Sequence, residues 1–302
     1  MSEGLDRYYH PSGRIPIVGT ASMLTLGTLV ALVLGFIYAV ISRYNPIIYV
    51  QVFVTLGFGA AMGITVRRVG HWTKVRNRIF RILISMLIGL MGLYFAWVWY
   101  IFVLSDWDTS LLIFDPQVTA TIIQELAAVG VWEFKNAKPT GYVLYAFWLI
   151  EAGIVLCMCY LTGSEVEEPF CEECDCWTKP GDLLVVAKCE TGSLKESLEE
   201  EQYDVVPKLT ELELDASDFL SVQCFTCPHC EESGYLTVSR VVTVPGQDGP
   251  TVTATVVIPP MAVPHSVTKQ VEQLAKNPVR RTVLPEGLET EIPPGGPEGE
   301  TK

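Results

Sequence analysis

Long stretches of apolar residues dominate the first half of the chain. They cover roughly residues 16–42, 47–66, 79–104 and 141–162. A helix needs about 20 mostly apolar residues to cross ~30 Å of hydrocarbon, and its backbone polar groups must pair within the segment because lipid offers no partners. The pattern therefore predicts a domain of four transmembrane helices over residues 16–162, preceded by an N-terminal segment of residues 1–15.

The stretch between the third and fourth apolar runs has a pattern of its own. Asp115 and Pro116 are typical of a helix start, and Gly130 is typical of a helix end. Between them the apolar residues recur at helical spacing. This pattern predicts a short helix near residues 116–129 that lies at the membrane interface.

Positive charge gathers between the second and third runs. This short loop contains Arg67, Arg68, Lys74, Arg76 and Arg78. Because short loops rich in Lys and Arg remain in the cytoplasm, we expect a multi-pass integral membrane protein with both termini cytoplasmic. The charge serves topology on this interpretation, with contact to anionic membrane lipid as the alternative.

The second half of the chain is acidic. Residues 1–162 contain 8 Asp and Glu against 11 Lys and Arg, whereas residues 163–302 contain 26 against 10. Binding to a nucleic-acid backbone needs clustered Lys and Arg, so no nucleic-acid partner is expected. The acidity is explained by solubility, with an acidic docking surface as the alternative.

Shorter patterns predict a small cytosolic α+β domain over residues 163–276. Residues 182–188 indicate a strand, and 193–202 a charged helix within a mixed segment that extends to Leu220. Residues 235–244 and 251–258 flank a Pro- and Gly-containing turn, which is typical of a β-hairpin. Residues 266–276 indicate a short helix. Pro, Gly and Glu dominate residues 277–302, which predicts a disordered tail.

Two Cys-x-x-Cys pairs lie in this domain, Cys171 with Cys174 and Cys227 with Cys230. In a reducing compartment clustered cysteines favour metal binding over disulfides, and four thiolates suit tetrahedral zinc. The arrangement resembles the zinc-ribbon class over the two pairs and the strand after each. It departs from that class where Asp175 and Glu231 replace a glycine, and in the 52 residues between the pairs. We expect zinc to supply the fold of a domain that lacks a large core.

Other cysteines leave an alternative open. Cys176, Cys189 and Cys224 are candidate extra ligands. The Cys224-x-x-Cys227-x-x-Cys230 run shares the spacing of bacterial ferredoxins, so an iron–sulfur cluster with a fourth ligand from Cys176 or Cys189 is the alternative to zinc. A metal-free thiol relay is a third interpretation, and the three extra cysteines are otherwise buried thiols.

One acidic residue, Glu151, lies within the fourth apolar run. A charged carboxylate is costly in lipid, so we expect it to be protonated, hydrogen-bonded to another helix, or exposed to water. It is either a proton or cation site, or a neutral side chain bonded to a Thr, Ser or Tyr, or to a second Glu151 in a homo-oligomer.

The motifs of the common hydrolases and ATPases are missing from the sequence, and we expect no enzymatic activity. The leading hypothesis is a membrane protein whose zinc-stabilised cytosolic domain docks a protein partner or assists assembly. The alternatives are a membrane redox component that uses the cysteines, and an oligomeric transporter or channel subunit that uses Glu151.

Overall fold

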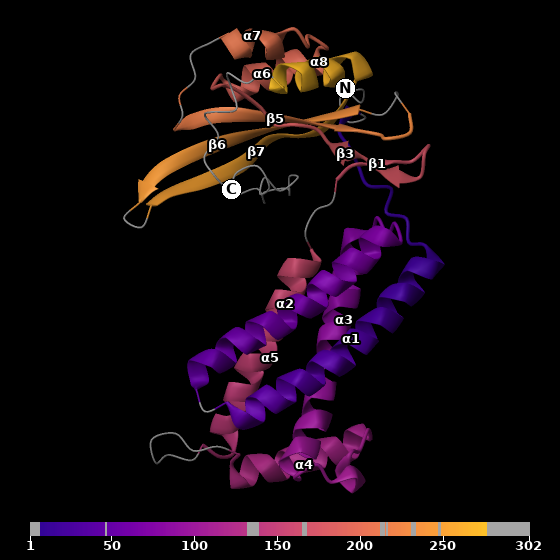
Figure 1. Ribbon diagram of the computed structural model, residues 1–302, viewed down its shortest axis with the longest axis vertical. Coiled ribbons are helices and arrows are strands. Elements are labelled where there is room, and N and C mark those ends of the chain that lie inside the picture. The colour runs from indigo at the N-terminus through magenta and orange to yellow at the C-terminus, as the bar shows by residue number, and fades with distance from the viewer. Residues whose placement is uncertain are drawn as a thin grey trace. The chain divides into compact units, whose positions relative to one another are not determined.

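The chain folds into two compact units, shown as a ribbon in Figure 1. The computed structural model describes residues 7–45, 47–131, 139–164, 168–211, 215, 217–230, 234–246 and 249–276. The first unit is helical and covers Ser12–Glu165. The second combines Val166–Lys302 with Met1–Pro11, so that the two ends of the chain share one unit.

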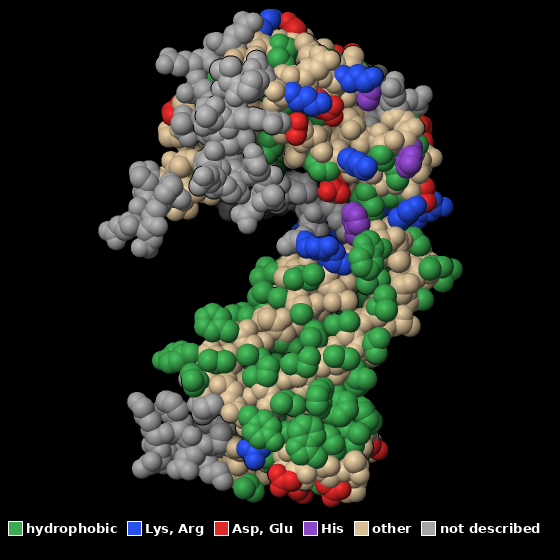
Figure 2. Space-filling view, viewed as in Figure 1, with side chains coloured by type: hydrophobic (Ala, Val, Ile, Leu, Met, Phe, Trp, Pro, Cys, Tyr) green, Lys and Arg blue, Asp and Glu red, His purple; other side chains and the backbone are tan. Residues whose placement is uncertain are grey.

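Four long helices form the helical unit: α1 (Ile17–Tyr44), α2 (Ile48–Trp72), α3 (Arg78–Leu104) and α5 (Tyr142–Gly163). Each is long and apolar enough to span a membrane. Helix α1 packs on α2 and α3, and α5 packs on α2 and α3. Figure 2 shows apolar side chains spread over the visible surface of these helices, as expected of a surface that faces lipid rather than water.

Helix ends follow local signals. Asn77 caps α3 by accepting a hydrogen bond from the Phe80 backbone N–H at 2.9 Å. Helix α2 continues to Trp72, beyond the predicted end at residue 66, because the expectation stopped where charge began. Arg67 and Arg68 are good helix formers, so the helix persists after its apolar stretch ends.

The helix between α3 and α5 lies where its capping residues predict it. Helix α4 spans Pro116–Val129 after a 3₁₀ turn at Thr109–Leu111. The Asp115 carboxylate accepts hydrogen bonds from the backbone N–H groups of Gln117 and Val118, at 2.8 and 3.3 Å. Gly130 ends the helix with φ of 81°, in the region that favours glycine.

Small residues let α2 and α5 approach closely. A Cβ built on Gly59 would lie 2.6 Å from the Val155 carbonyl oxygen, whereas one built on Gly57 would meet nothing within 4 Å. Gly59 therefore faces α5 and Gly57 does not. This is the packing role that small residues serve in membrane helices.

The second unit is a five-stranded antiparallel sheet covered on one face by three helices (Figure 1). Its strands are β3 (Lys179–Pro180), β4 (Leu184–Ala187), β5 (Asp218–Thr226), β6 (Gly234–Gly246) and β7 (Gly249–Val263). Both β3 and β4 pair with β5, and β5 is followed in the sheet by β6 and β7. The helices are α6 (Thr191–Glu199), α7 (Val205–Glu211) and α8 (His265–Ala275).

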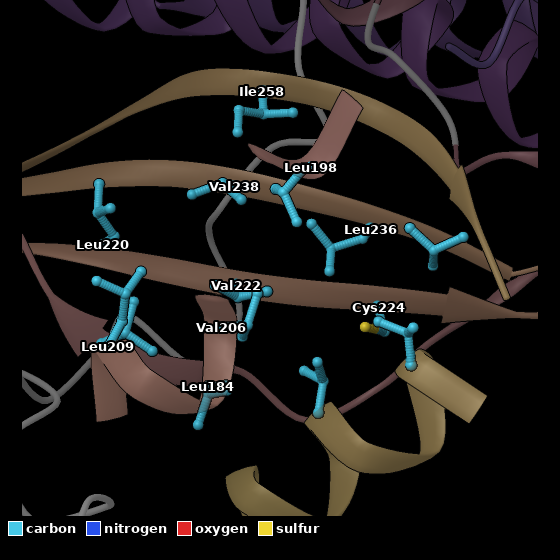
Figure 3. Close-up of a cluster of buried hydrophobic side chains, with 14 of the residues drawn as sticks. Leu184, Leu198, Val206, Leu209, Leu220, Val222, Cys224, Leu236, Val238 and Ile258 are labelled. Carbon is cyan, nitrogen blue, oxygen red and sulfur yellow. The ribbon is translucent and has the colours of Figure 1, made fainter. Parts of the chain in front are cut away.

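Between this sheet and its helices lies a substantial hydrophobic core (Figure 3). Fully buried members include Leu184, Leu198, Leu220, Leu236 and Ile258. The expectation that the domain lacks a large core is therefore wrong. The error lies in the region between the cysteine pairs, where the predicted charged helix is found as α6 but the mixed segment after it supplies helix α7 and the central strand β5.

A short N-terminal stretch belongs to the same unit. Tyr8 forms an antiparallel bridge with Met261 of β7, and the Tyr9 N–H donates to the Pro260 carbonyl oxygen at 2.8 Å. The Tyr8 hydroxyl also donates to Glu199 of α6 at 2.6 Å. The predicted separate segment of residues 1–15 is thus divided, with its described residues up to Pro11 in the sheet unit. The predicted tail of residues 277–302 lies outside the described residues.

Candidate metal centre

The first cysteine pair lies on a small hairpin of β1 (Phe170–Cys171) and β2 (Cys176–Trp177). Cys171 pairs with Cys176 across the hairpin, and Cys174 lies in the turn between them. Asp175 has φ of 47°, the left-handed region that glycine enters most easily. Asp is among the residues that tolerate this region, so Asp175 takes the conformation that a glycine at this position would supply.

The second pair follows β5 directly, after its last residue Thr226. We call each Cys-x-x-Cys turn, residues 171–174 and 227–230, a knuckle. In the second knuckle the backbone N–H of His229 donates to the Cys227 sulfur at 3.4 Å, as expected where backbone amides point toward sulfur. Burial raises the pKa of Cys227, but hydrogen bonds from the His229 and Cys230 amides and from neighbouring thiols outweigh it and lower the pKa to about 6. The His229 side chain is exposed and lies outside the sulfur cluster.

The two knuckles meet. The sulfur atoms of Cys171, Cys174, Cys227 and Cys230 all lie within 4.8 Å of one another. Cys171 Sγ lies 3.8 Å from Cys230 Sγ. Four thiolates around tetrahedral zinc at ~2.3 Å are separated by ~3.8 Å, so the arrangement can hold a metal ion of that size with little movement.

A fifth sulfur lies beside the cluster. Cys176 Sγ is 3.6 Å from Cys227 Sγ. Burial, together with the neighbouring Cys227, raises the pKa of Cys176 to about 11. Cys176 therefore lies in contact with the four-sulfur group.

The remaining two candidate ligands lie elsewhere. Cys224 is fully buried in the hydrophobic core among the residues of Figure 3, and burial raises its pKa to about 12. Cys189 packs at the edge of the same core. The run Cys224, Cys227 and Cys230 therefore does not converge on one cluster. Strand geometry explains this, because Cys224 points to the core face of β5 while Cys227 lies in the turn beyond its end.

Glu151 has neutral partners within the helical unit. Tyr38 of α1 donates a hydrogen bond to its carboxylate, and the Gln51 amide of α2 donates to the same oxygen at 3.3 Å. Thr55 lies 3.0 Å from the Tyr38 hydroxyl. The sequence interpretation expected a Thr, Ser or Tyr partner but did not identify these three residues. The signal that could have found Gln51 is that it is a lone amide in an apolar helix.

Comparisons with protein-family models, with curated proteins and with solved structures gave no match to this chain. The functional interpretation therefore rests on the residues and their geometry.

Proposed function

We propose that the chain is a multi-pass membrane protein with both termini in the cytoplasm, whose sheet unit holds zinc and docks a protein partner. The zinc ligands are Cys171, Cys174, Cys227 and Cys230. The observation that carries the proposal is the convergence of these four sulfurs from two separate turns. Zinc supplies no redox chemistry, so on this proposal it fixes the two knuckles as one rigid surface.

The contacts of the N-terminal stretch support a topology in which the residues before α1 and those after α5 lie on the same side of the membrane. The bridge between Tyr8 and Met261 joins the stretch before α1 to the unit after α5. A chain that crosses a membrane four times returns to its starting side, so four spanning helices are compatible with this bridge and an odd number is not. The turn between α2 and α3 then lies on the same side. Its Lys and Arg residues favour the cytoplasm for that side.

Exposed acidic side chains support a docking role for the knuckles. Glu172 and Glu173 stand between the two ligands Cys171 and Cys174 and are exposed. Because the ligands that flank them are anchored, their positions are restrained, and a preorganised surface loses less entropy on binding. The negative charge of Glu172 and Glu173 suits a partner with basic residues.

The fifth sulfur favours a second candidate, a redox role. Cys176 is in contact with Cys227, and four thiolates also bind iron–sulfur clusters. A membrane-bound electron carrier would show iron and visible absorption, whereas zinc is colourless. The two candidates are separated by metal analysis.

Photo-crosslinking in cells tests the docking proposal. A photoreactive amino acid replaces Glu173, and a matched control replaces exposed Lys269 of α8. We expect a discrete crosslinked partner from position 173 that disappears in the double variant Cys171→Ser/Cys174→Ser and persists in Cys189→Ser. A partner that is retained after the cysteines and the metal are lost would contradict the proposal.

The proposed topology has a separate test. Reporter tags at either end and within the α2–α3 turn should all map to the cytoplasmic side, and a tag in the α1–α2 turn to the opposite side. Tags that place the two ends on different sides would overturn it.

A further inference from the structure

A polar cluster lies inside the helical unit, apart from the cysteines. It joins Glu151 of α5 to Tyr38 of α1 and to Gln51 and Thr55 of α2. Tyr38 and Thr55 are buried, whereas Glu151 and Gln51 are partly exposed. Glu151 lies more than two helical turns after the start of α5 at Tyr142. The carboxyl group therefore belongs to a helix that is long and apolar enough to span a membrane.

Polar side chains form a path from Glu151 toward one end of the unit, by which water can approach the carboxyl group. The Gln51 amide donates to Glu151 at 3.3 Å, to the Tyr38 hydroxyl at 3.0 Å and to the Ser42 hydroxyl at 2.8 Å. Ser42 lies two residues before α1 ends at Tyr44. The path thus runs from the carboxyl group to the turn that joins α1 and α2.

The opposite direction is closed by apolar side chains. The Phe58 ring stacks on the Tyr38 ring, with centroids 4.6 Å apart. Beyond it, Met62 of α2 and Val155 and Cys159 of α5 are fully buried. Water and ions have no polar partners among these side chains, so the described residues give the carboxyl group access from one side.

The charged and titratable groups near Glu151 come from each helix that packs around it. Tyr38 is the titratable group on α1, and Gln51 and Thr55 on α2 carry no charge. Tyr100 of α3 is electrostatically coupled both to Glu151 and to Arg43, which lies near the end of α1. A carboxyl group in this setting is held by neutral donors, with a cation near the mouth of the path.

We propose that Glu151 is a proton-binding site that exchanges its proton with one face of the membrane, the face of the α1–α2 turn. Apolar surroundings favour a neutral carboxyl group, and hydrogen-bond donors, here Tyr38 and Gln51, stabilise the anion that forms when such a group releases its proton. The site gives the chain a response to pH, or a coupling to protons, on the side opposite its termini. It does not depend on the cysteine cluster or on a docking partner.

Carbodiimide labelling tests this proposal. Dicyclohexylcarbodiimide enters membranes and modifies protonated carboxyl groups, and peptide mass spectrometry identifies the modified residue. The full-length protein is labelled in sealed vesicles whose inner and outer pH are set independently. An N-terminal epitope shows which side faces out, and the α1–α2 turn lies on the other side because α1 crosses once.

We expect modification of Glu151 to rise at least roughly fivefold when the pH on the α1–α2 side falls from 9 to 5, because apolar surroundings favour the neutral form of a carboxyl group. The same change on the other side should leave labelling unaltered. Exposed Glu125 of α4 is the internal control, and this carboxyl group in water should show little labelling by a reagent that acts from within the membrane.

Variants along the path separate proton exchange from a purely structural role. Ser42→Ala removes the outermost polar side chain of the path, which leaves less to hold water there, and should slow the response to a pH jump. Thr25→Ala is the matched control on the same helix, because the Thr25 hydroxyl bonds the backbone of its own helix. Absence of Glu151 labelling at every pH, or labelling that follows the pH of the other side, would overturn the proposal. Both results come from the unmodified protein and so do not depend on a variant that folds.

Discussion

Removal of the proposed metal should loosen the two knuckles and leave the sheet folded. The perturbation is a chelator, or the double variant Cys171→Ser/Cys174→Ser, applied to the full-length protein. The knuckles contribute a hairpin with two pairs of residues, whereas the core between the sheet and its helices is built from residues outside them. Metal loss should therefore open β1 and β2 alone.

The size of the effect follows from Phe170. Its side chain is fully buried and contacts Trp177 edge-to-face, with ring centroids 4.9 Å apart. Opening the hairpin exposes this side chain, and burial of a Phe stabilises by ~1.5–3 kcal/mol. Because ~1.4 kcal/mol corresponds to a factor of ten, amides of β1 and β2 should exchange roughly 10- to 150-fold faster.

Hydrogen exchange followed by mass spectrometry measures this directly. We expect little change in the amides of β5 and β6 in the metal-free protein. Leu198→Ala is the contrasting variant, because Leu198 is fully buried in the core and its truncation should cost ~2–5 kcal/mol across the whole unit. If chelation instead accelerated exchange of the β5 and β6 amides as much as that of the β1 and β2 amides, the hydrophobic core would depend on the metal for its stability and the reasoning would be refuted.

Three further predictions concern other contacts. Gly59→Leu should lower the melting temperature of the detergent-solubilised protein because it forces α2 from α5, whereas Gly57→Leu should not; equal effects would refute the close approach. Arg240 and Lys188 hold the pKa of Asp218 well below its usual range. That stability is fully present above a carboxyl pKa of ~3.9 and is lost as pH falls through the much lower pKa of the folded state, so thermal melts should separate wild type from Asp218→Asn at pH 7 and the gap should begin to narrow below a pH of ~3.9; a constant gap down to the most acidic pH at which the unit stays folded would contradict this. Tyr8→Phe removes the hydrogen bond to Glu199 and should cost ~1 kcal/mol in denaturant unfolding of the sheet unit, and no change would mean that the N-terminal stretch adds no stability there.

The four long apolar helices were predictable because each is specified by its own residues. Length and apolar content locate a spanning segment without knowledge of its neighbours, and Asp115 with Gly130 marks α4 in the same way. The end of α2 was less predictable, because Arg67 and Arg68 mark the edge of the apolar segment and not the end of the helix.

Contacts between distant residues were harder to predict. Spacing identified Cys171, Cys174, Cys227 and Cys230, because each pair is local and the two pairs are alike. It could not distinguish Cys224 from a ligand, because that depends on which face of β5 is covered by helices. The strand β5 itself was missed, since its role is defined by pairing with β4 and β6. The bridge from Tyr8 to β7 likewise joins positions that lie far apart along the chain.

The metal content of the full-length protein tests the central claim most directly. The protein is purified in detergent under anaerobic conditions without chelators or affinity metals, and metal analysis is combined with an absorption spectrum. The account predicts one zinc per chain with no visible absorption, and loss of that zinc in Cys171→Ser/Cys174→Ser but not in Cys189→Ser. Iron with a visible charge-transfer band, or four free thiols without any metal, would contradict it.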